Sequence, residues 1–233
     1  RQMCIRDRIG LLKTDLPNNY GLHRTSIGVP TESTMEQKFD LIDNIYNMIV
    51  AFRSGNVSLE MSEPTETEVI NYEQYLNGLA GTKFEQGRKR CDYIVYEKSE
   101  ETRRFFVLNE QTSAIGSTQL LSKPILDKDK NVLYPGGKYE KVEVQLQETL
   151  HTLVKVPSIA TFIDKYSRKV CLMSYIIHPR TNISNAQKAF AARYKEVEAR
   201  ETGENGALLA SPEINMLGFE YRRISHDYVF HLF

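Results

Sequence analysis

Two acidic side chains in neighbouring strand-like segments are the residues of this chain whose types and spacing indicate chemistry. Asp92 lies near the start of the segment 91–97, and Glu110 ends the segment 104–110. Both segments are rich in Tyr, Ile, Val and Phe and are joined by a short polar link, which predicts a β-hairpin. If the hairpin is centred on Glu101, Asp92 and Glu110 lie opposite each other on one face, about 5 Å apart.

Two carboxylates in this arrangement predict a metal site. Like charges directly opposed across a strand pair are destabilising unless a positive charge lies between them. A divalent cation satisfies that condition, and hard oxygen ligands suit Mg²⁺. We therefore expect Mg²⁺ to be held by Asp92 and Glu110.

The order of the predicted elements resembles the core of the PD-(D/E)xK nuclease superfamily. In that family a helix precedes a hairpin that carries Asp and then Glu-x-Lys, and a helix and a further strand follow. Here Asp92 matches the family's Asp, and Glu110-Gln111-Thr112 matches Glu-x-Lys with Thr112 in the lysine position. The resemblance covers 65–177, roughly half of the chain.

The resemblance implies metal-dependent cleavage of DNA phosphodiesters, in which the metal polarises the phosphodiester and a lysine-assisted water attacks phosphorus. Some members carry the lysine on the following helix, where Lys138, Lys141, Gln145 and Glu148 form one polar stripe. Lys141 and Gln145 are accordingly the candidates for the displaced lysine and a supporting polar group. By the same resemblance, Glu73 on the preceding helix is the candidate for a third metal ligand.

Other functions remain open at this stage. The missing lysine favours a non-enzymatic binding or interaction protein on the same scaffold, and an assembly protein of a mobile element is a third alternative. Sequences that predict other chemistries are absent: the chain has no Gly-x-x-x-x-Gly-Lys loop, no Gly-x-Gly-x-x-Gly sequence and no His pair at metalloprotease spacing. ATP-driven and dinucleotide chemistry are therefore disfavoured.

The composition is that of a globular protein with no net charge. The 233 residues include 30 Lys+Arg and 30 Asp+Glu, and 41% are hydrophobic, which excludes a disordered or low-complexity chain. No apolar run is long enough to span a membrane. The opening octapeptide, residues 1–8, resembles a translated sequencing adapter. Without it the chain has 27 basic and 29 acidic residues, so DNA contact would rest on local basic clusters, at 88–90, 103–104 and 222–223.

Residues 1–34 are expected to be an artefactual or disordered segment, with Met35 a candidate start, and 35–233 a single α/β domain. Cys91 and Cys171 lie in strand-like segments without metal-ligand spacing, which favours buried free thiols in a reducing compartment such as the cytoplasm. The oligomeric state has no signal in the sequence.

The predicted elements give a mixed α/β fold, with α+β as the alternative, in which a mixed central sheet with a hairpin is flanked by helices. Besides the hairpin, we expect a buried central strand at 169–177 and a last hairpin formed by 219–224 and 228–233. An irregular segment is expected at 113–137. Helices are expected at 35–52, after Pro64 with Ile70, Leu76 and Leu79 on the apolar face, at 139–156, at 159–166 and at 184–201.

Overall fold

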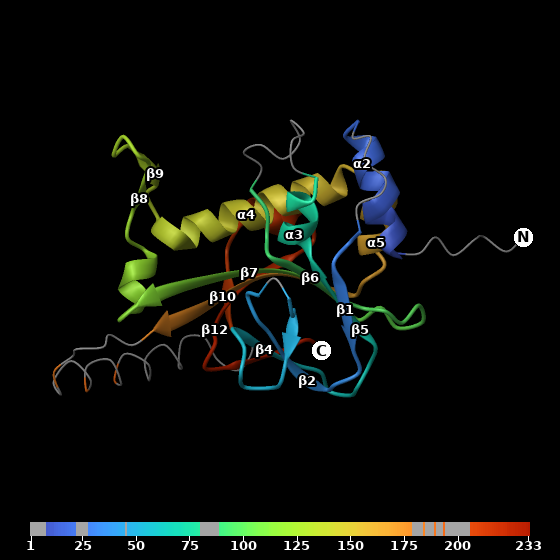
Figure 1. Cartoon of the computed structure of the whole chain (residues 1–233), viewed down its shortest axis with the longest axis horizontal. Helices are drawn as coiled ribbons and strands as arrows, with labels where there is room; N and C mark the ends of the chain where they lie inside the picture. The colour runs from blue at the N-terminus through green and yellow to red at the C-terminus, as the bar shows by residue number, and fades with distance from the viewer. Residues whose placement is uncertain are drawn as a thin grey trace, which may run out of the picture.

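The computed structural model describes residues 8–21, 28–44, 46–79, 89–178 and 206–233, and the single residues 184, 189 and 193. A seven-stranded mixed sheet, sheet A, lies at the centre (Figure 1). Helices cover one face of sheet A, and a four-stranded sheet, sheet B, lies on the other face. The prediction of a mixed α/β fold is therefore confirmed, and sheet B is a layer that the sequence did not indicate.

Sheet A contains, in spatial order, β1 (Thr31–Thr34), β5 (Thr67–Asn71), β6 (Tyr93–Glu97), β7 (Phe105–Ile115), β10 (Arg168–His178), β12 (Glu220–Ser225) and β11 (Ala207–Leu209). Its first four strands are antiparallel neighbours, whereas β7, β10 and β12 run parallel. Sheet B contains β13 (Val229–His231), β4 (Val57–Glu60), β2 (Lys38–Leu41) and β3 (Ile49–Val50). A separate hairpin consists of β8 (Ile125–Leu126) and β9 (Val132–Tyr134).

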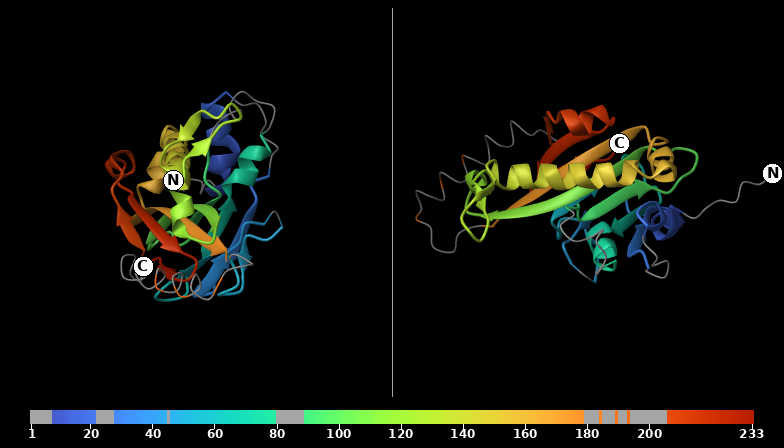
Figure 2. Two further views of the ribbon diagram at one scale, coloured as in Figure 1. Left: turned by 90° about the vertical axis from the view of Figure 1, so that its left-hand side faces the viewer. Right: turned by 90° about the horizontal axis from the view of Figure 1, so that it is seen from above.

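The helices lie mainly on one side of sheet A (Figure 2). The longest described helix, α4, follows the β8–β9 hairpin and extends along β7 and β10. The described helical segments are α1 (Arg8–Gly10), the π-helical η1 (Leu11–Asp15), α2 (Leu16–Asn19), α3 (Tyr72–Asn77), the 3₁₀ turn η2 (Thr118–Leu121), α4 (Gly137–Val154), α5 (Pro157–Ile163) and α7 (Pro212–Met216). None of the helices among the described residues has the length and apolar composition needed to cross a membrane.

Two hydrophobic cores lie on the two faces of sheet A. Ile94 and Leu108 pack on the helix side, whereas Tyr93 and Val107 pack on the side of sheet B. Both faces of the central strands are covered, which explains why β6 and most of β10 are buried without a polar face. The predicted central strand at 169–177 is therefore confirmed as part of β10.

The predicted hairpin of β6 and β7 is also confirmed, including its register. Tyr93 pairs with Asn109 and Tyr96 pairs with Phe106, so the numbers of opposing residues have the sum expected for a hairpin centred on Glu101. The predicted helices at 139–156 and 159–166 correspond to α4 and α5, with boundaries shifted by two or three residues.

The helix predicted at 35–52 is wrong, because part of this segment forms β2 and β3 of sheet B. Phe39 and Leu41 fill the core between the sheets. The buried Asp40 carboxylate accepts the backbone N–H groups of Ser54 and Gly55, both at 2.6 Å. These side chain-to-backbone hydrogen bonds stabilise a turn whose backbone is not helical. Tertiary burial thus overrides the helical spacing of the apolar residues.

The helix predicted after Pro64 is only partly correct. Residues 67–71 form β5, every residue of which is buried between the two cores. The helix begins after Asn71, whose side-chain oxygen accepts the N–H of Gln74 at 2.7 Å as an N-cap. The buried segment 67–71, rich in β-branched residues, therefore forms a strand, and the helix begins later than predicted.

Three further expectations need correction or lie outside the description. Residues 1–34 are expected to be artefactual or disordered, but Leu12 and Leu16 are buried in the helix-side core and β1 pairs with β5. The last two strands do not form a hairpin, because β12 pairs with β10 and β11 while β13 crosses to pair with β4. The irregular segment at 113–137 contains the end of β7, η2 and the β8–β9 hairpin. The helix predicted at 184–201 lies outside the described ranges.

Gly137 fixes the junction between the β8–β9 hairpin and α4. Its φ is +71°, and a Cβ there would lie 2.5 Å from both the Leu121 and the Lys123 carbonyl oxygens. We predict that Gly137→Ala lowers the free energy of unfolding by about 2–4 kcal/mol, measured by urea denaturation. Gly21→Ala is the matched control, since Gly21 has φ +67° but open space around the Cβ position. Equal losses in the two variants would show that contact with the two carbonyls is unimportant.

Candidate active site

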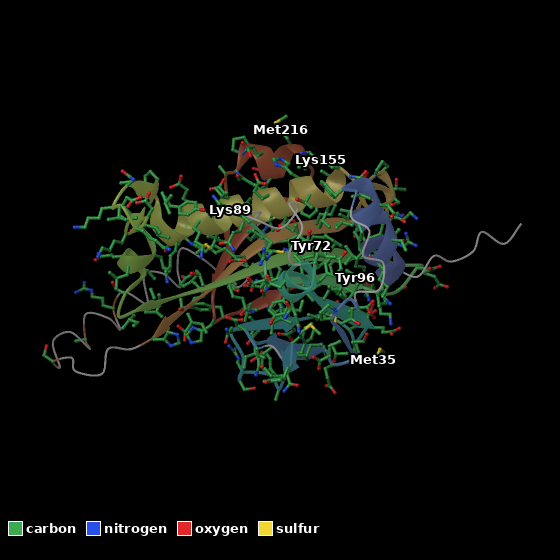
Figure 3. All side chains as sticks on the ribbon, turned by 45° about the horizontal axis from the view of Figure 1, so that its top comes forward. Met35, Tyr72, Lys89, Tyr96, Lys155 and Met216 are labelled. Carbon is green, nitrogen blue, oxygen red and sulfur yellow. The ribbon has the colours of Figure 1, made fainter. Side chains whose placement is uncertain are left out.

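The backbone of Asp92 is fixed where β6, β7 and α3 meet. Its N–H donates to the Asn109 carbonyl at 3.1 Å, and its own carbonyl accepts the N–H groups of Tyr72 at 2.8 Å and Glu73 at 3.3 Å. Its carboxylate Oδ2 accepts the backbone N–H of Gln111 at 2.7 Å. Figure 3 shows Tyr72, the first residue of α3, near the middle of the molecule beneath α4. The half-buried Asp92 carboxylate is thus held at one end of the β6 strand.

Glu110 lies on β7 and faces α4. Its side chain is only 5% exposed, and Gln145 Nε2 on α4 donates to its Oε1 at 2.7 Å. The same amide nitrogen donates to the Arg90 carbonyl at 2.9 Å. Because the NH₂ group serves two acceptors, the orientation of the Gln145 amide is specified by its contacts. The β6–β7 pairing ends at Tyr93 and Asn109, and Asp92 lies in a bend directly before β6. Its carboxylate accepts the N–H of Gln111, the residue after Glu110, and its charge raises the pKa of Glu110.

Thr149, one turn after Gln145, is a part of the site that sequence reasoning missed. Its Oγ1 accepts the N–H of Cys91 at 2.7 Å and donates to the Gln145 carbonyl at 2.9 Å. This contact ties α4 to the residue directly before Asp92. The spacing of four from Gln145 could have indicated it, whereas the predicted stripe member Glu148 is exposed.

The electrostatic environment opposes ionisation of both carboxyl groups. Burial, together with the charges of Glu73 and Asp43, raises the pKa of Asp92 to about 7, against the N–H of Gln111 and the charge of Lys141. Burial and the Asp92 charge raise the pKa of Glu110 well above its usual range, although Lys141 and Gln145 act in the opposite direction. Two interacting carboxyls with raised pKa values are typical of functional sites.

Two buried oxygens of the site have no hydrogen-bond partner among the described residues: Glu110 Oε2 and Gln145 Oε1. Unsatisfied buried oxygens are costly and need an explanation. Both are hard oxygen donors on adjacent side chains, and the Asp92 carboxylate adds a third oxygen donor nearby. The donor set therefore fits a divalent cation such as Mg²⁺.

The position of Glu73 is less favourable for a ligand. Its side chain is 49% exposed, and its Oε1 lies 3.9 Å from Arg90 Nε. Its charge contributes to the raised pKa values of Asp92 and Glu110. Among the described residues, no group of three or more His, Cys, Asp or Glu side chains is placed to hold a metal ion. The role of Glu73 as a third ligand stays a prediction.

The two lysines of the predicted stripe have different environments. Lys138 Nζ donates to the Ser113 carbonyl near the end of β7. Lys141 is exposed one turn before Gln145, and its charge favours ionised Asp92 and Glu110. Of the two lysines, only Lys141 thus has a described electrostatic effect on the carboxyl pair.

A row of polar side chains near Glu110 holds β7 in place. Asn109, fully buried, donates to the Leu172 carbonyl at 3.1 Å and to Ser174 Oγ at 3.0 Å. Gln111 Nε2 donates to Asn109 Oδ1 at 3.3 Å, and Gln111 Oε1 accepts from Asn56 Nδ2 at 3.0 Å. These bonds fix the residues on either side of Glu110, and hence the backbone N–H that binds Asp92.

The cysteines beside the site behave as expected from the sequence. Cys91 and Cys171 are buried and free. Burial raises the pKa of both thiols, and the Glu110 and Asp92 charges raise that of Cys91 further. Since the thiolate is the reactive form, neither cysteine is suited to be a nucleophile.

Comparison of the chain with protein-family models, with curated protein sequences and with solved structures gave no significant match in any of the three. The interpretation of the site therefore rests on its own geometry.

The raised pKa values predict that the carboxyl pair destabilises the metal-free protein at neutral pH. In the unfolded chain Asp92 ionises near the ordinary aspartate pKa of 3.8, whereas the folded chain keeps the proton up to about 7. Stability is therefore lost as pH rises through this window. We expect Asp92→Asn and Glu110→Gln each to raise the free energy of unfolding at pH 7.5 by about 1–3 kcal/mol in the presence of a chelator.

Thermal unfolding at pH 3.5 and pH 7.5 checks this expectation, since the gain should vanish at the lower pH. Asp127→Asn is the control of opposite sign: hydrogen bonds from Asn131 hold the pKa of Asp127 below its usual value, so this variant should lose stability at pH 7.5. A destabilising effect of Asp92→Asn and Glu110→Gln at pH 7.5 would contradict the predicted cost of the pair.

Proposed function

We propose that the protein is a divergent PD-(D/E)xK-like nuclease that uses Mg²⁺ to hydrolyse DNA phosphodiesters. The observation that carries the proposal is the buried Glu110 carboxylate, which has one oxygen without a hydrogen bond among the described residues and whose pKa is raised by the Asp92 charge. A buried carboxyl beside a half-buried one, both with raised pKa values, is unfavourable when both are ionised, and a bound cation would offset that cost.

The order of elements around the site supports the proposal. Helix α3 precedes the β6–β7 hairpin, Asp92 lies directly before β6 and Glu110 lies on β7, and α4 and then β10, which is parallel to β7, follow. This is the order that the sequence resemblance implies. The residues of α4 that act on the carboxyls, Lys141 and Gln145, are those that the resemblance selects.

In this proposal Asp92, Glu110 and the side-chain amide oxygen of Gln145 would hold the metal. When bound, Mg²⁺ supplies the Lewis-acid chemistry that polarises a phosphodiester and lowers the pKa of a bound water. Lys141 would orient the attacking water through its ammonium group and offset the negative charge on the non-bridging phosphoryl oxygens. The water oxygen forms a bond to phosphorus, the bond from phosphorus to one ester oxygen breaks, and that oxygen leaves with a proton.

A non-enzymatic DNA-binding protein is the second candidate. The observation that favours it is Thr112, which has the place of the family's lysine on β7 two residues after Glu110. The proposed lysine, Lys141, is exposed and is not bonded to either carboxylate in a described contact. In this alternative the carboxyl pair would bind a cation, and DNA would be bound but not cleaved.

The first test measures metal binding and cleavage together. We expect the wild-type chain to bind Mn²⁺ or Mg²⁺ by calorimetry and to cleave DNA only when one of them is present. Asp92→Asn and Glu110→Gln should each reduce both the metal affinity and the cleavage rate at least about 100-fold, because each removes a charged ligand. Circular dichroism should show an unchanged fold.

The matched control for this test is Glu148→Gln, which removes a carboxylate from the exposed side of the same helix. It should leave binding and cleavage within about twofold of wild type. Metal binding without cleavage would favour the second candidate, and the absence of both would refute the proposal.

A second test concerns the lysine. We expect Lys141→Gln to lower kcat about 100-fold without changing metal affinity, because the lysine acts on water and phosphate. Residue 112 lies on the same face of β7 as Glu110, since side chains alternate along a strand. Thr112→Lys should therefore restore activity at least about tenfold in the Lys141→Gln background. Glu148→Lys is the control for a charge merely added to α4, and equal recovery there would contradict a positional role of the lysine.

A further inference from the structure

The β8–β9 hairpin is ordered internally but leaves its apolar residues exposed. Asp127 Oδ1 accepts the N–H groups of Asp129 and Asn131, both at 2.8 Å, and closes the turn. Leu126, Val132 and Leu133 are nevertheless 49–55% exposed. An isolated two-stranded hairpin is marginally stable in water, and exposed apolar residues on it indicate a contact surface.

One arginine in each of two basic clusters that the sequence suggested for DNA contact, 103–104 and 222–223, is paired within the fold. Arg104 forms ion pairs with Glu97 and Glu63, and Arg222 forms an ion pair with Glu220 at 2.5 Å. These guanidinium groups hold sheet A and its margins together. Their charges are already compensated, so they are poor candidates for phosphate contacts.

The lysines of the hairpin, in contrast, have no described carboxylate within ion-pair distance. Lys123, Lys128 and Lys130 are exposed at its base and tip. The two aspartates between them include Asp127, whose carboxylate is occupied by the turn. Its three lysines and two aspartates leave residues 123–130 with a net charge of +1 beside exposed apolar side chains. This combination suits a polyanion with apolar faces.

Further lysines lead from the hairpin to the carboxyl pair. Lys89 Nζ lies 4.5 Å above the Tyr134 ring of β9 and is labelled in Figure 3. Lys138, at the start of α4, donates a hydrogen bond to the Ser113 carbonyl. Lys141 follows one turn later on the same helix. In Figure 2 the hairpin lies beyond the N-terminal end of α4, so that a bound strand would extend along this line from the site.

We propose that the β8–β9 hairpin is a DNA-binding arm, which inserts as a two-stranded ribbon into a groove of duplex DNA that extends beyond the Asp92–Glu110 site. A two-stranded β-ribbon fits the width of the major groove. Lys123, Lys128 and Lys130 contact phosphates, while Leu126 and Leu133 contact sugars and base edges. The choice of DNA as partner rests on the proposed function, but the binding role is independent of cleavage.

The test is fluorescence anisotropy with a labelled duplex of about 30 base pairs in the presence of a chelator, so that no cleavage occurs. The triple variant K123Q/K128Q/K130Q should bind at least about tenfold more weakly at about 0.1 M salt. The slope of log K against log salt should become less negative by about 2–3, because three phosphate contacts are lost. Leu126→Ser/Leu133→Ser should weaken binding several-fold without changing this slope.

The matched control is K13Q/K155Q/K165Q, which removes the same charge outside the arm, and Figure 3 labels Lys155 just past the C-terminal end of α4. This control should bind within about twofold of wild type. If the control weakened duplex binding equally, the binding would be non-specific charge attraction, and the proposed role of the arm would be refuted. A wild-type chain that does not bind the duplex would also overturn it. So would a dimer, detected by sedimentation, that Leu133→Ser dissolves.

The outcomes separate this inference from the proposed function. If wild type cleaves DNA and the triple lysine variant binds the duplex as wild type does, the DNA-binding role of the arm is refuted and the proposed nuclease function is not. Binding that depends on the arm, without metal-dependent cleavage, supports the arm and refutes the nuclease. All variants compared should unfold at the same temperature as wild type, since the substituted side chains are half-buried or exposed.

Discussion

The contact on which the site depends is the bridge made by the Gln145 amide between Glu110 Oε1 and the Arg90 carbonyl. It joins α4 to β7 and to the segment before β6, and so determines which part of the helix lies over the carboxyl pair. The bridge requires that Glu110 faces the helices. A register slip of one residue would turn Glu110 into the core of sheet B, where Tyr93 and Val107 now pack. Hairpin register and helix position are thus mutually dependent.

The parts of the fold that could be predicted are those in which a local pattern and tertiary burial agree. The β6–β7 hairpin joins two β-branched and aromatic segments by a short polar link, and α4 has an apolar face that meets sheet A. The segment 35–52 has helical spacing as well, yet it folds as strands because Asp40 captures the N–H groups of a turn and Phe39 enters the second core. Sheet B could not be foreseen, since its strands are short and β13 comes from the far end of the chain.

The same distinction applies to the site. Asp92 and Glu110 could be selected by residue type and spacing, because charged residues in apolar strand-like segments are visible in a sequence. Gln145 belongs to a four-residue polar stripe, and the family resemblance selects it from that stripe. The groups that orient them are mostly backbone: the N–H of Gln111, the carbonyl of Arg90 and the N–H of Cys91. Backbone groups have no signature of residue type, so their roles emerge only when the strands and α4 are in place.

The zero net charge of the chain includes cations that form ion pairs and exposed cations that form none among the described residues. Arg104, Arg168 and Arg222 are paired with carboxylates inside or at the margin of sheet A, as expected for a planar group that binds in two directions at once. Lys128, Lys130 and Lys141 remain exposed without a described ion pair. The acidic excess at the site is likewise local, because Asp92 lies close enough for its charge to raise the pKa of Glu110. Attraction of a polyanion would then depend on where on the surface positive charges remain uncompensated. The net charge of the whole chain does not indicate these positions.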